Sequence, residues 1–353
     1  MWLEIKERMT DPSLVAQGSY GCIFDPPSKC RGSEVTHPKS VGKVFYDPSH
    51  SENEARAMEV VRRIDPKGRY TVPMRVRCPI DPTPAMRKAC SHLGPSEGRG
   101  AVKDVEQIVY PRAGQDLARY VESNPDFDVL DLVSGMAQVM EGLRLLAGAG
   151  YCHRDMKPSN IMVQSKGRRM RITDFGMTCP FDRLYAPDQG YVLAFNYEYY
   201  PPEFKIYYDY ALAELEYVND PTLFIANDVQ LNYLDAPLQW ITDLADFKTV
   251  VTKVLGMANY DPAPTELKGA PTDVLRSALE GLAEKVDVFG AGASFMRVFD
   301  MSSKKYASPK HTVQRGALYD TLRACTDLNP ITRITASEAR DRLRRVALDL
   351  SRI

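Results

Sequence analysis

The chain contains 353 residues, of which 44% are hydrophobic and 26% are charged, and its net charge is −1. This composition is that of an ordinary globular protein, and the length allows one large core or two lobes that share a cleft. A chain so close to neutral lacks the strongly basic surface that a sequence-independent nucleic-acid binder needs, so we expect no nucleic-acid partner.

The N-terminal residues and the hydropathy pattern argue against secretion and membrane insertion. The first eight residues include four charged side chains, where a signal peptide needs an apolar stretch. No apolar run approaches the roughly 20 residues that cross a bilayer. We therefore expect an intracellular, soluble protein with no membrane span.

The seven cysteines are an odd number and show no evident paired framework. We therefore expect unpaired thiols in a reducing compartment. A zinc site is the alternative, because some side chains near the N-terminal part are of the types that bind Zn²⁺. They lack the C-x₂-C spacing typical of such sites. The candidate ligands are Cys30, His37, Cys78, Cys90 and His92.

The first hundred residues read mainly as strands. Short apolar or β-branched runs at 14–15, 22–24 and 41–45 are bounded by Gly, Pro and Ser, and further strands are expected near 70–76 and 104–109. One helix interrupts them, with Ser51 as its expected N-cap and Glu54 completing a capping box. A segment rich in Pro, Gly and Cys at 78–100 is expected to be an inserted loop.

The pattern becomes helical from about Asp128, where apolar residues are spaced to form one face of a long helix. We expect an α+β protein with a small strand-rich lobe over 1–112 and a larger helical lobe over 113–353. The chemistry should lie between the two lobes.

The strongest functional signal lies in two segments, residues 151–163 and residues 173–176. Phosphoryl transfer to an alcohol needs a carboxylate to accept the hydroxyl proton, cations to offset phosphate charge, and ligands for Mg²⁺. Asp155 is suited to the first role and Lys157 to the second. The side-chain oxygens of Asn160 and Asp174 suit a hard cation.

These two segments resemble the catalytic loop and the metal-binding loop of eukaryotic-type protein kinases. Lys157, two residues after Asp155, matches the Ser/Thr class, whereas tyrosine kinases usually carry an Arg farther along and small-molecule kinases lack this Lys. The resemblance extends from about residue 15 to 340. It implies a bilobal kinase fold, ATP and Mg²⁺ as cofactors, and a protein substrate with a Ser or Thr acceptor.

The resemblance also implies a glycine-rich loop and an ion pair at the ATP phosphates. Gly18 and Gly21 would let backbone N–H groups approach phosphate oxygens, although Ala16 stands where the family has its first glycine. Lys43 lies where the family places its phosphate-binding lysine, and its expected partner is Glu54. Glu52, two residues earlier in the same expected helix, is the alternative partner.

Other nucleotide contacts follow from the same resemblance. Val109 would be the gatekeeper, the residue before the hinge at 110–112, and Asp116 would bind the ribose. The alternative role of Asp116 is to cap the next helix, and one residue can fill both roles. The remaining contacts implied are Val15, Ile23, Val41, Tyr110, Arg112 and Met162.

Three further residues match structural supports of the family. Glu203 and Arg333 are expected to form a buried ion pair, and Asp287 is expected to fix the backbone around 153–154. The chain departs from the family at Asn196, where Ser/Thr kinases have a Thr, which leaves the peptide preference open.

The stretch at about 204–284 is longer than the family requires, so we expect a folded helical insert in the C-terminal lobe. It contains 13 acidic and 5 basic residues. Two hypotheses remain for it: a solvated extension of the lobe, or a docking surface for a basic partner.

The motif at 21–26, with Cys30 nearby and the Tyr-Tyr-Pro-Pro-Glu ending at 199–203, is similar to kinases of large cytoplasmic DNA viruses. This resemblance implies a virion-associated kinase in the host cytoplasm or the virion. Two alternative functions remain: a pseudokinase scaffold, which should lack Lys43, Asp155 or Asp174, and a kinase for a lipid or small molecule, which should lack Lys157.

The activation segment suggests how such an enzyme is regulated. By resemblance, Arg154 belongs to a basic pocket that binds a phosphorylated loop. Between 174 and 203, however, the only Ser or Thr is Thr178, directly after the metal-binding loop. Asp182, Asp188 or Glu198 is available to pair with Arg154 permanently.

We therefore predict that the enzyme is active without phosphorylation. Protein made in bacteria and treated with a broad phosphatase should keep its activity in a radiolabelled ATP assay, because a carboxylate already supplies the negative charge. Loss of activity on treatment, with recovery after rephosphorylation within 174–203, would contradict this.

Overall fold

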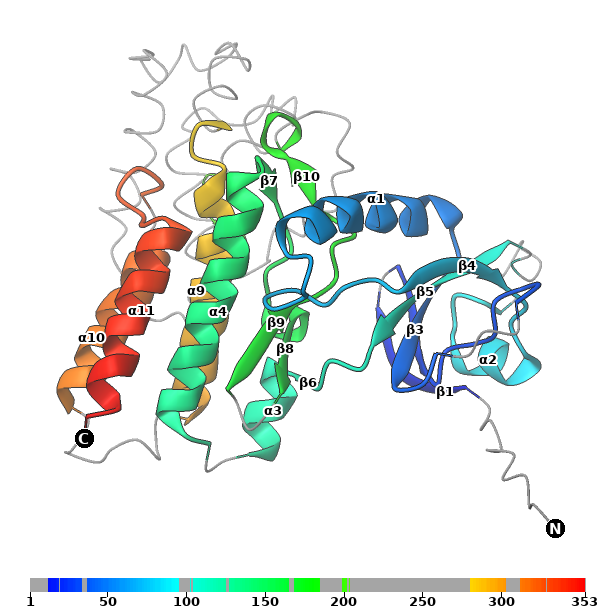
Figure 1. Ribbon diagram of the computed structural model, residues 1–353, viewed down its shortest axis with the longest axis horizontal. Helices are drawn as coiled ribbons and strands as arrows, with labels where there is room; N and C mark the ends of the chain where they lie inside the picture. The colour runs from blue at the N-terminus through cyan, green and yellow to red at the C-terminus, as the bar shows by residue number, and fades with distance from the viewer. Residues whose placement is uncertain are drawn as a thin grey trace, which may run out of the picture. The chain divides into compact units, whose positions relative to one another are not determined.

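The computed structural model describes residues 12–18, 20–33, 37–94, 102, 104–124, 127–164, 168–184, 199–201, 203, 280–302, 312–327 and 329–352. The chain divides into two compact units, Met1–Ala113 and Gly114–Ile353, and each is described by itself. Figure 1 shows strands and two helices in the first unit, and mainly helices in the second.

The first unit is built on a five-stranded antiparallel sheet in the order β1-β2-β3-β5-β4 (Figure 1). The strands predicted at 14–15, 22–24, 41–45 and 104–109 are confirmed, with extended bounds. The bounds are β1 Ser13–Gly18, β2 Gly21–Asp25, β3 Ser40–Phe45, β4 Val76–Ile80 and β5 Val105–Pro111.

The strand predicted at 70–76 is wrong, because β4 begins only at Val76. The carboxylate of Asp65 accepts the backbone N–H groups of Arg69, Tyr70 and Thr71 at 2.8–2.9 Å, so these donors are not available to a neighbouring strand. Pro73 has no N–H to donate. The segment is a turn held by one carboxylate, and pairing starts after it.

Helix α1 (Pro48–Ile64) begins earlier than predicted, and its N-cap is Asp47 rather than Ser51. The Asp47 carboxylate accepts the N–H of Ser49 at 2.8 Å, which lowers the pKa of this carboxyl, and Pro48 occupies the first turn. Ser51 lies inside the helix and donates to the Pro48 carbonyl at 2.9 Å.

The segment predicted to be an inserted loop at 78–100 is folded over much of its length. It contains the end of β4 and a short helix, α2 (Pro84–Ala89), which Thr83 caps by accepting the N–H of Met86. Met86 and Leu93 are fully buried in a cluster with residues of the sheet. The segment is therefore part of the core of this unit, and residues 95–100 lie outside the described residues.

The prediction of unpaired cysteines is wrong for this unit, because it contains the disulfides Cys22–Cys90 and Cys30–Cys78. The partners are 68 and 48 residues apart in the sequence, and only the folding of the sheet brings them together. The argument for a reducing compartment therefore fails. The zinc alternative loses three of its five ligands to these bonds, and no cluster of three potential ligands occurs in the described part.

The remaining three cysteines, Cys152, Cys179 and Cys325, are free and buried. Burial raises the pKa of each thiol, to about 11 for Cys179 and about 12 for Cys325. These thiols therefore stay protonated and pack as small apolar side chains.

The second unit is mainly helical, with two small sheets at its N-terminal end (Figure 1). One sheet has the order β6-β8-β9 and the other pairs β7 with β10. The bounds are α3 Leu117–Ser123, α4 Val129–Gly148, α9 Glu284–Ser302, α10 Thr312–Cys325, α11 Ala336–Leu350, β6 Gln115–Asp116, β7 Tyr151–Cys152, β8 Ile161–Gln164, β9 Arg169–Ile172, β10 Cys179–Pro180, and the 3₁₀ turns η1 Pro158–Asn160 and η3 Phe181–Arg183.

Helix α4 starts as predicted, with Asp128 as its N-cap. The apolar face predicted for this helix is buried, and burial extends beyond it, because α4 packs against α11, α9 and β9. Two acidic residues are buried with it. Asp131 pairs with Arg168 at 2.9 Å, and Glu141 pairs with Arg144 and Arg340 at 2.9 and 2.6 Å. These pairs compensate for removing the carboxylates from water.

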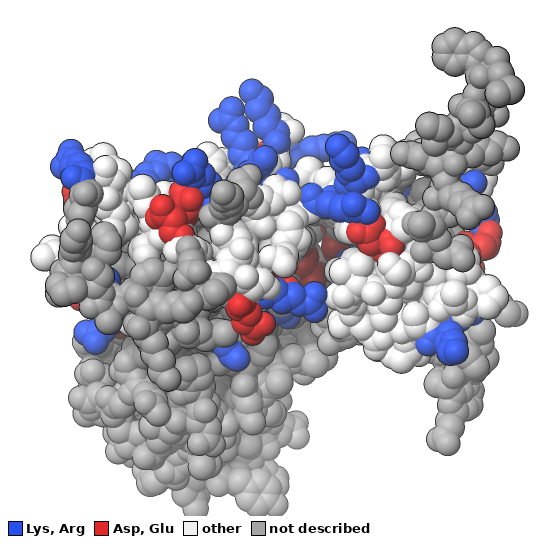
Figure 2. Space-filling model, turned by 90° about the horizontal axis from the view of Figure 1, so that it is seen from below, with Lys and Arg blue, Asp and Glu red and all other residues white. Residues whose placement is uncertain are grey.

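Among the described residues, none of the helices combines the length and the hydropathy that a membrane span requires. On the face drawn in Figure 2, the described Lys and Arg side chains form separate groups, some of them beside Asp or Glu. The acidic insert predicted at about 204–284 lies outside the described residues as far as 279.

We predict that Glu141→Gln lowers the free energy of unfolding by about 1–3 kcal/mol at pH 7, because Arg144 and Arg340 lose a charged partner. The bonds to Arg144 lower the pKa of Glu141 from 4.5 to about 2. Its stabilisation is therefore present above about pH 4.5 and is lost as the pH falls towards 2.

The measurement is urea unfolding of wild type and variant between pH 7 and pH 3.5, where the difference should shrink. Asp349→Asn is the matched control, because its pair with Arg352 is exposed and 3.7 Å long, and it should cost less than about 0.5 kcal/mol. A difference that is constant across this pH range would contradict the assignment.

Candidate active site

The register of the first sheet gathers several predicted nucleotide contacts on one face. Lys43 of β3 pairs with Ile23 of β2, and Val41 pairs with Tyr110 of β5. Directly opposite residues share a face, and neighbours along a strand alternate. Ile23, Val41, Lys43 and Tyr110 therefore lie on the same face of the sheet.

Lys43 forms an ion pair with Glu54 of α1, with 2.6 Å between Nζ and Oε2. The Glu54 carboxylate is 1% exposed, and its other oxygen accepts the Tyr110 hydroxyl at 2.5 Å. Glu52 instead pairs with Arg56 on the helix surface. The predicted Lys43–Glu54 contact is confirmed, and the Tyr110 hydroxyl is a second donor to the Glu54 carboxylate.

Val109 does not face Lys43. It pairs with Gly42 of β3 and Val76 of β4, which places it on the opposite face of the sheet, where it is fully buried. The side chain at the end of β5 that lies on the Lys43 face is Tyr110. The sequence prediction chose Val109 instead, because residues 108–110 are all hydrophobic and show no alternation that distinguishes the two faces.

The two glycines of the predicted glycine-rich loop differ in their surroundings. A Cβ atom at Gly21 would lie 2.2 Å from the carbonyl oxygen of Val44, so close packing of β2 on β3 requires glycine there. A Cβ atom at Gly18 would meet nothing closer than 3.9 Å. Packing within the protein therefore does not explain Gly18, and Ser19 lies outside the described residues.

The other predicted contacts of this unit are more exposed. Val15 lies in β1 beside an irregularity in register and is 47% exposed. The side chain of Arg112 forms an ion pair with Asp25, and its backbone N–H donates to the Lys39 carbonyl at 2.9 Å.

In the second unit, three predicted catalytic residues lie together. Nζ of Lys157 is 2.8 Å from Oδ2 of Asp155. The side-chain amide of Asn160 donates to the same Oδ2 at 2.9 Å and to the Asp155 carbonyl at 2.7 Å. The Asp155 carboxylate is thus oriented by a cation and an amide.

Asp287 holds the backbone directly before Asp155. Its carboxylate accepts the N–H groups of His153 and Arg154 at 2.6 and 2.9 Å, which confirms the prediction. Burial raises the pKa of Asp287, whereas His153 and the backbone donors lower it. Arg154 has φ 67°, a strained conformation that surrounding contacts must maintain.

His153 links the two predicted loops of this unit. Its Nδ1 accepts the N–H of Asp155 at 3.2 Å, so the proton lies on Nε2, which donates to the Thr173 carbonyl at 3.0 Å. Its ring packs edge-on against Phe175, with centroids 4.9 Å apart. Asp174, which follows Thr173 in the second loop, has a positive φ of 64°.

Asp116 and Met162 lie opposite each other in the β6–β8 pair. The Asp116 carboxylate accepts the N–H of Arg119 at 3.0 Å and so caps α3. This is the alternative role that the sequence allowed, and it leaves the second carboxylate oxygen facing the Arg119 guanidinium at 3.4 Å.

The donor set fits Mg²⁺. The amide nitrogen of Asn160 is engaged by Asp155, which leaves its carbonyl oxygen for a hard cation, and Asp174 supplies a carboxylate. Mg²⁺ is commonly bound by one or two such groups together with substrate phosphates, so a larger protein cage is not required.

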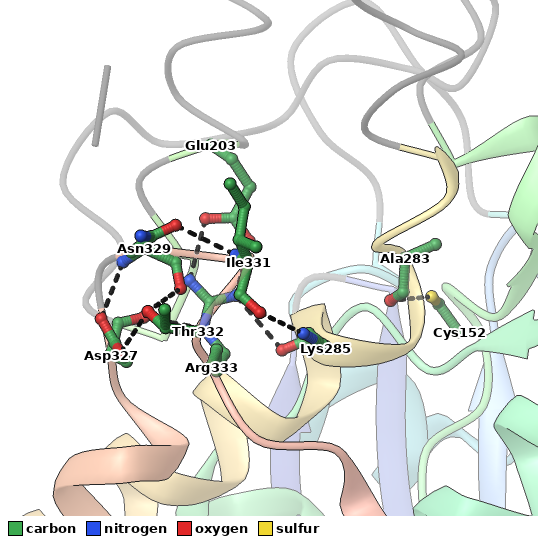
Figure 3. Close-up of polar contacts among 9 residues, drawn as sticks. All are labelled: Cys152, Glu203, Ala283, Lys285, Asp327, Asn329, Ile331, Thr332 and Arg333. Atoms are coloured by element: carbon green, nitrogen blue, oxygen red, sulfur yellow. Dashed lines mark hydrogen bonds and ion pairs between the residues drawn. The ribbon is translucent and has the colours of Figure 1, made fainter. Parts of the chain in front are cut away.

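The predicted Glu203–Arg333 pair is confirmed, and Figure 3 shows it. The two side chains form two parallel bonds of 2.5 and 2.9 Å and are almost completely buried. Arg333 also donates to the Asp327 carbonyl at 2.8 Å and packs over the Phe289 ring. Such a bidentate pair joins the segment at 203 to the C-terminal helices.

Several predictions fall on residues that the structure does not describe. Asn196, Asp188 and Glu198 lie outside the described residues, whereas Asp182 lies on η3. For Arg154, the basic residue of the predicted pair, the structure gives a contact of Nη1 with Sγ of Cys179 at 3.9 Å. The predicted pairing with an acidic residue stays a prediction.

Comparison with known proteins supports a kinase fold. Residues 107–211 match the family described as protein kinase domain. The serine/threonine-protein kinase bur1 of Emericella nidulans is 28% identical over 177 residues, 50% of this chain and 29% of that protein. The probable serine/threonine-protein kinase MRK1 homolog of Encephalitozoon cuniculi is 38% identical over 69 residues, 20% of this chain and 21% of that protein.

The mitogen-activated protein kinase HOG1 of Ustilaginoidea virens is 25% identical over 190 residues, 54% of this chain and 46% of that protein. The chain thus spans less than half the length of each of these relatives. Residues 107–211 are thus similar to a protein kinase domain, and each of these relatives is a protein kinase. The β-sheet-rich N-terminal part and the helical C-terminal part agree with the predicted α+β fold.

Proposed function

We propose that this chain is an active protein serine/threonine kinase that transfers the γ-phosphoryl group of ATP to a protein hydroxyl. The observation that carries the proposal is the geometry around Asp155, whose carboxylate contacts Lys157 at 2.8 Å and Asn160 at 2.9 Å. Asp155 accepts the proton of the attacking hydroxyl, and Lys157 offsets charge on the transferring group. Mg²⁺, when bound by Asn160 and Asp174, neutralises phosphate charge.

The first unit contributes residues that hold ATP. Lys43, oriented by Glu54 and Tyr110, binds the α- and β-phosphates as a fixed point charge. Ile23 and Val41 provide apolar surface for the base on the same face of the sheet. The room around Gly18 supports the same proposal, because glycine there is explained by a phosphate that must come close to the backbone.

The proposal has two further parts: the substrate is a protein, and the chain does not bind nucleic acid. The similarity to protein kinase domains supports the first part, and the net charge of −1 supports the second. On the one face drawn in Figure 2, the described Lys and Arg side chains form separate groups. A basic partner for the acidic insert at 204–284, and a viral, virion-associated role, rest on sequence features alone. Co-purification from the native source tests both.

We predict that Asp155→Asn and Asp174→Asn each lower kcat by at least about 100-fold, because each removes a charge at the reacting centre. The measurement is transfer from labelled ATP with Mg²⁺ to a generic basic protein, alongside thermal unfolding to verify the fold. Asp128→Asn is the control, since Asn also caps a helix and should leave activity unchanged. Either catalytic variant keeping more than about a tenth of kcat would refute the role.

The ion pair of the first unit yields a second prediction. Lys43→Met should lower kcat/KM strongly, and Glu54→Gln should do so by releasing Lys43. Because the two residues act as one unit, the double variant should lose far less than the product of the two single losses. Glu52→Gln should have little effect, because its pair with Arg56 is exposed. Multiplicative losses would show that the residues act independently.

A further inference from the structure

The segment at 83–93, which we name the brace, is attached to the turn between β1 and β2. Resting on the proposed function, we propose that the brace is a positioning element: it holds the glycine-rich turn in place through the Cys22–Cys90 disulfide and the contacts of Ser91 and His92, and thereby sets the affinity for ATP. The contacts reach both strands that flank the turn.

The covalent attachment is at Cys22, the second residue of β2. Cys22 follows Gly21 directly, and its disulfide partner Cys90 ends α2. Both cysteines are fully buried, in the cluster that also contains Met86 and Leu93. The start of β2 therefore cannot move without moving the brace.

Polar contacts attach the other strand. The Gln17 amide donates to the Ser91 hydroxyl at 2.5 Å and accepts the Ser91 N–H at 3.3 Å. Nε2 of His92 donates to the carbonyl of Gly18 at 3.0 Å. Gly18 in turn pairs with Gly21 across the turn. The brace thus contacts the backbone of the glycine proposed to approach phosphate.

The brace is itself anchored. Within it, Thr83 caps α2 and Nη1 of Arg87 donates to the Leu93 carbonyl at 3.1 Å. The same Nη1 donates outside it, to the Val102 carbonyl at 3.0 Å. The His92 ring stacks on Tyr46, with centroids 4.8 Å apart. These contacts make the brace a fixed support, so attachment to it restricts the turn.

The brace lies on the side of the sheet away from Lys43. Cys22 pairs with Val44, whereas Ile23 pairs with Lys43, and neighbouring residues alternate between faces. The support therefore leaves the nucleotide face open. A turn held in its binding conformation loses less conformational entropy when ATP binds, which raises affinity.

Reduction should release this support. Dithiothreitol breaks the S–S bond by two exchange steps: two electrons and two protons pass to Cys22 and Cys90, which become thiols, and the reagent closes to its cyclic disulfide. The second disulfide, Cys30–Cys78, belongs to the same cluster but joins the chain after β2 to strand β4. It therefore offers a matched control.

The test compares the full chain, Cys22→Ser/Cys90→Ser and Cys30→Ser/Cys78→Ser. Peptide mapping without reductant should find the Cys22–Cys90 link. Loss of that link should raise KM for ATP and Kd for Mg²⁺–ADP by about 5- to 30-fold and accelerate hydrogen exchange at 17–22, with kcat at saturating ATP within about twofold. The Cys30/Cys78 variant should keep both constants.

A purely structural role would lower the active fraction, and hence kcat, without changing KM. Equal rises of KM in both double variants, unchanged constants in both, or absence of the Cys22–Cys90 link would overturn the proposal. ADP affinity and hydrogen exchange need no phosphoryl transfer, so an inactive wild type would refute the proposed function without deciding this one.

Single variants guard against a double variant that fails to fold. Gln17→Ala and His92→Ala keep both disulfides and remove exposed contacts, so the fold is retained. Each should raise KM for ATP by about two- to tenfold. If neither does, the brace does not position the turn.

Discussion

The buried carboxylate of Asp287 is the constraint on which the candidate active site depends. Its two bonds to backbone N–H groups, at 2.6 and 2.9 Å, hold Arg154 at φ 67°, a conformation that costs of order 1–3 kcal/mol. Because the next residue is Asp155, this strain fixes the direction of the proposed base. A buried carboxylate is costly on its own, and here the loop donors and His153 compensate for its desolvation.

In the first unit, the two faces of the sheet have different roles. One face carries Lys43, which forms an ion pair with the buried carboxylate of Glu54, and the same carboxylate accepts the Tyr110 hydroxyl. The other face is packed with apolar side chains and two disulfides. Because strand neighbours alternate, Cys22 and Ile23 serve opposite faces although they are adjacent. Packing on one side can therefore stabilise the backbone on which the other side depends.

Contacts within one local motif were readable from the sequence. Asp155, Lys157 and Asn160 are within five residues of one another, and their side-chain types together with the resemblance to a kinase catalytic loop assigned them to one site. The Lys43–Glu54 and Glu203–Arg333 pairs were expected from the resemblance to protein kinases, and the cost of an unpaired buried charge agrees with both. Helix starts were less predictable: Asp47 and Ser51 are both good caps, and the Pro after Asp47 decided between them.

The sequence by itself determined the kinase-like order of motifs, the strands β1 to β3 and the start of α4, since each depends on residues close together in the chain. Only the tertiary structure decided which face of β5 carries Val109 and which carries Tyr110, because an unbroken apolar run contains no alternation. The same holds for the cysteines. Cys22 and Cys90 are 68 residues apart, and no local sequence pattern predicts their contact, because it depends on the packing of α2 against the sheet.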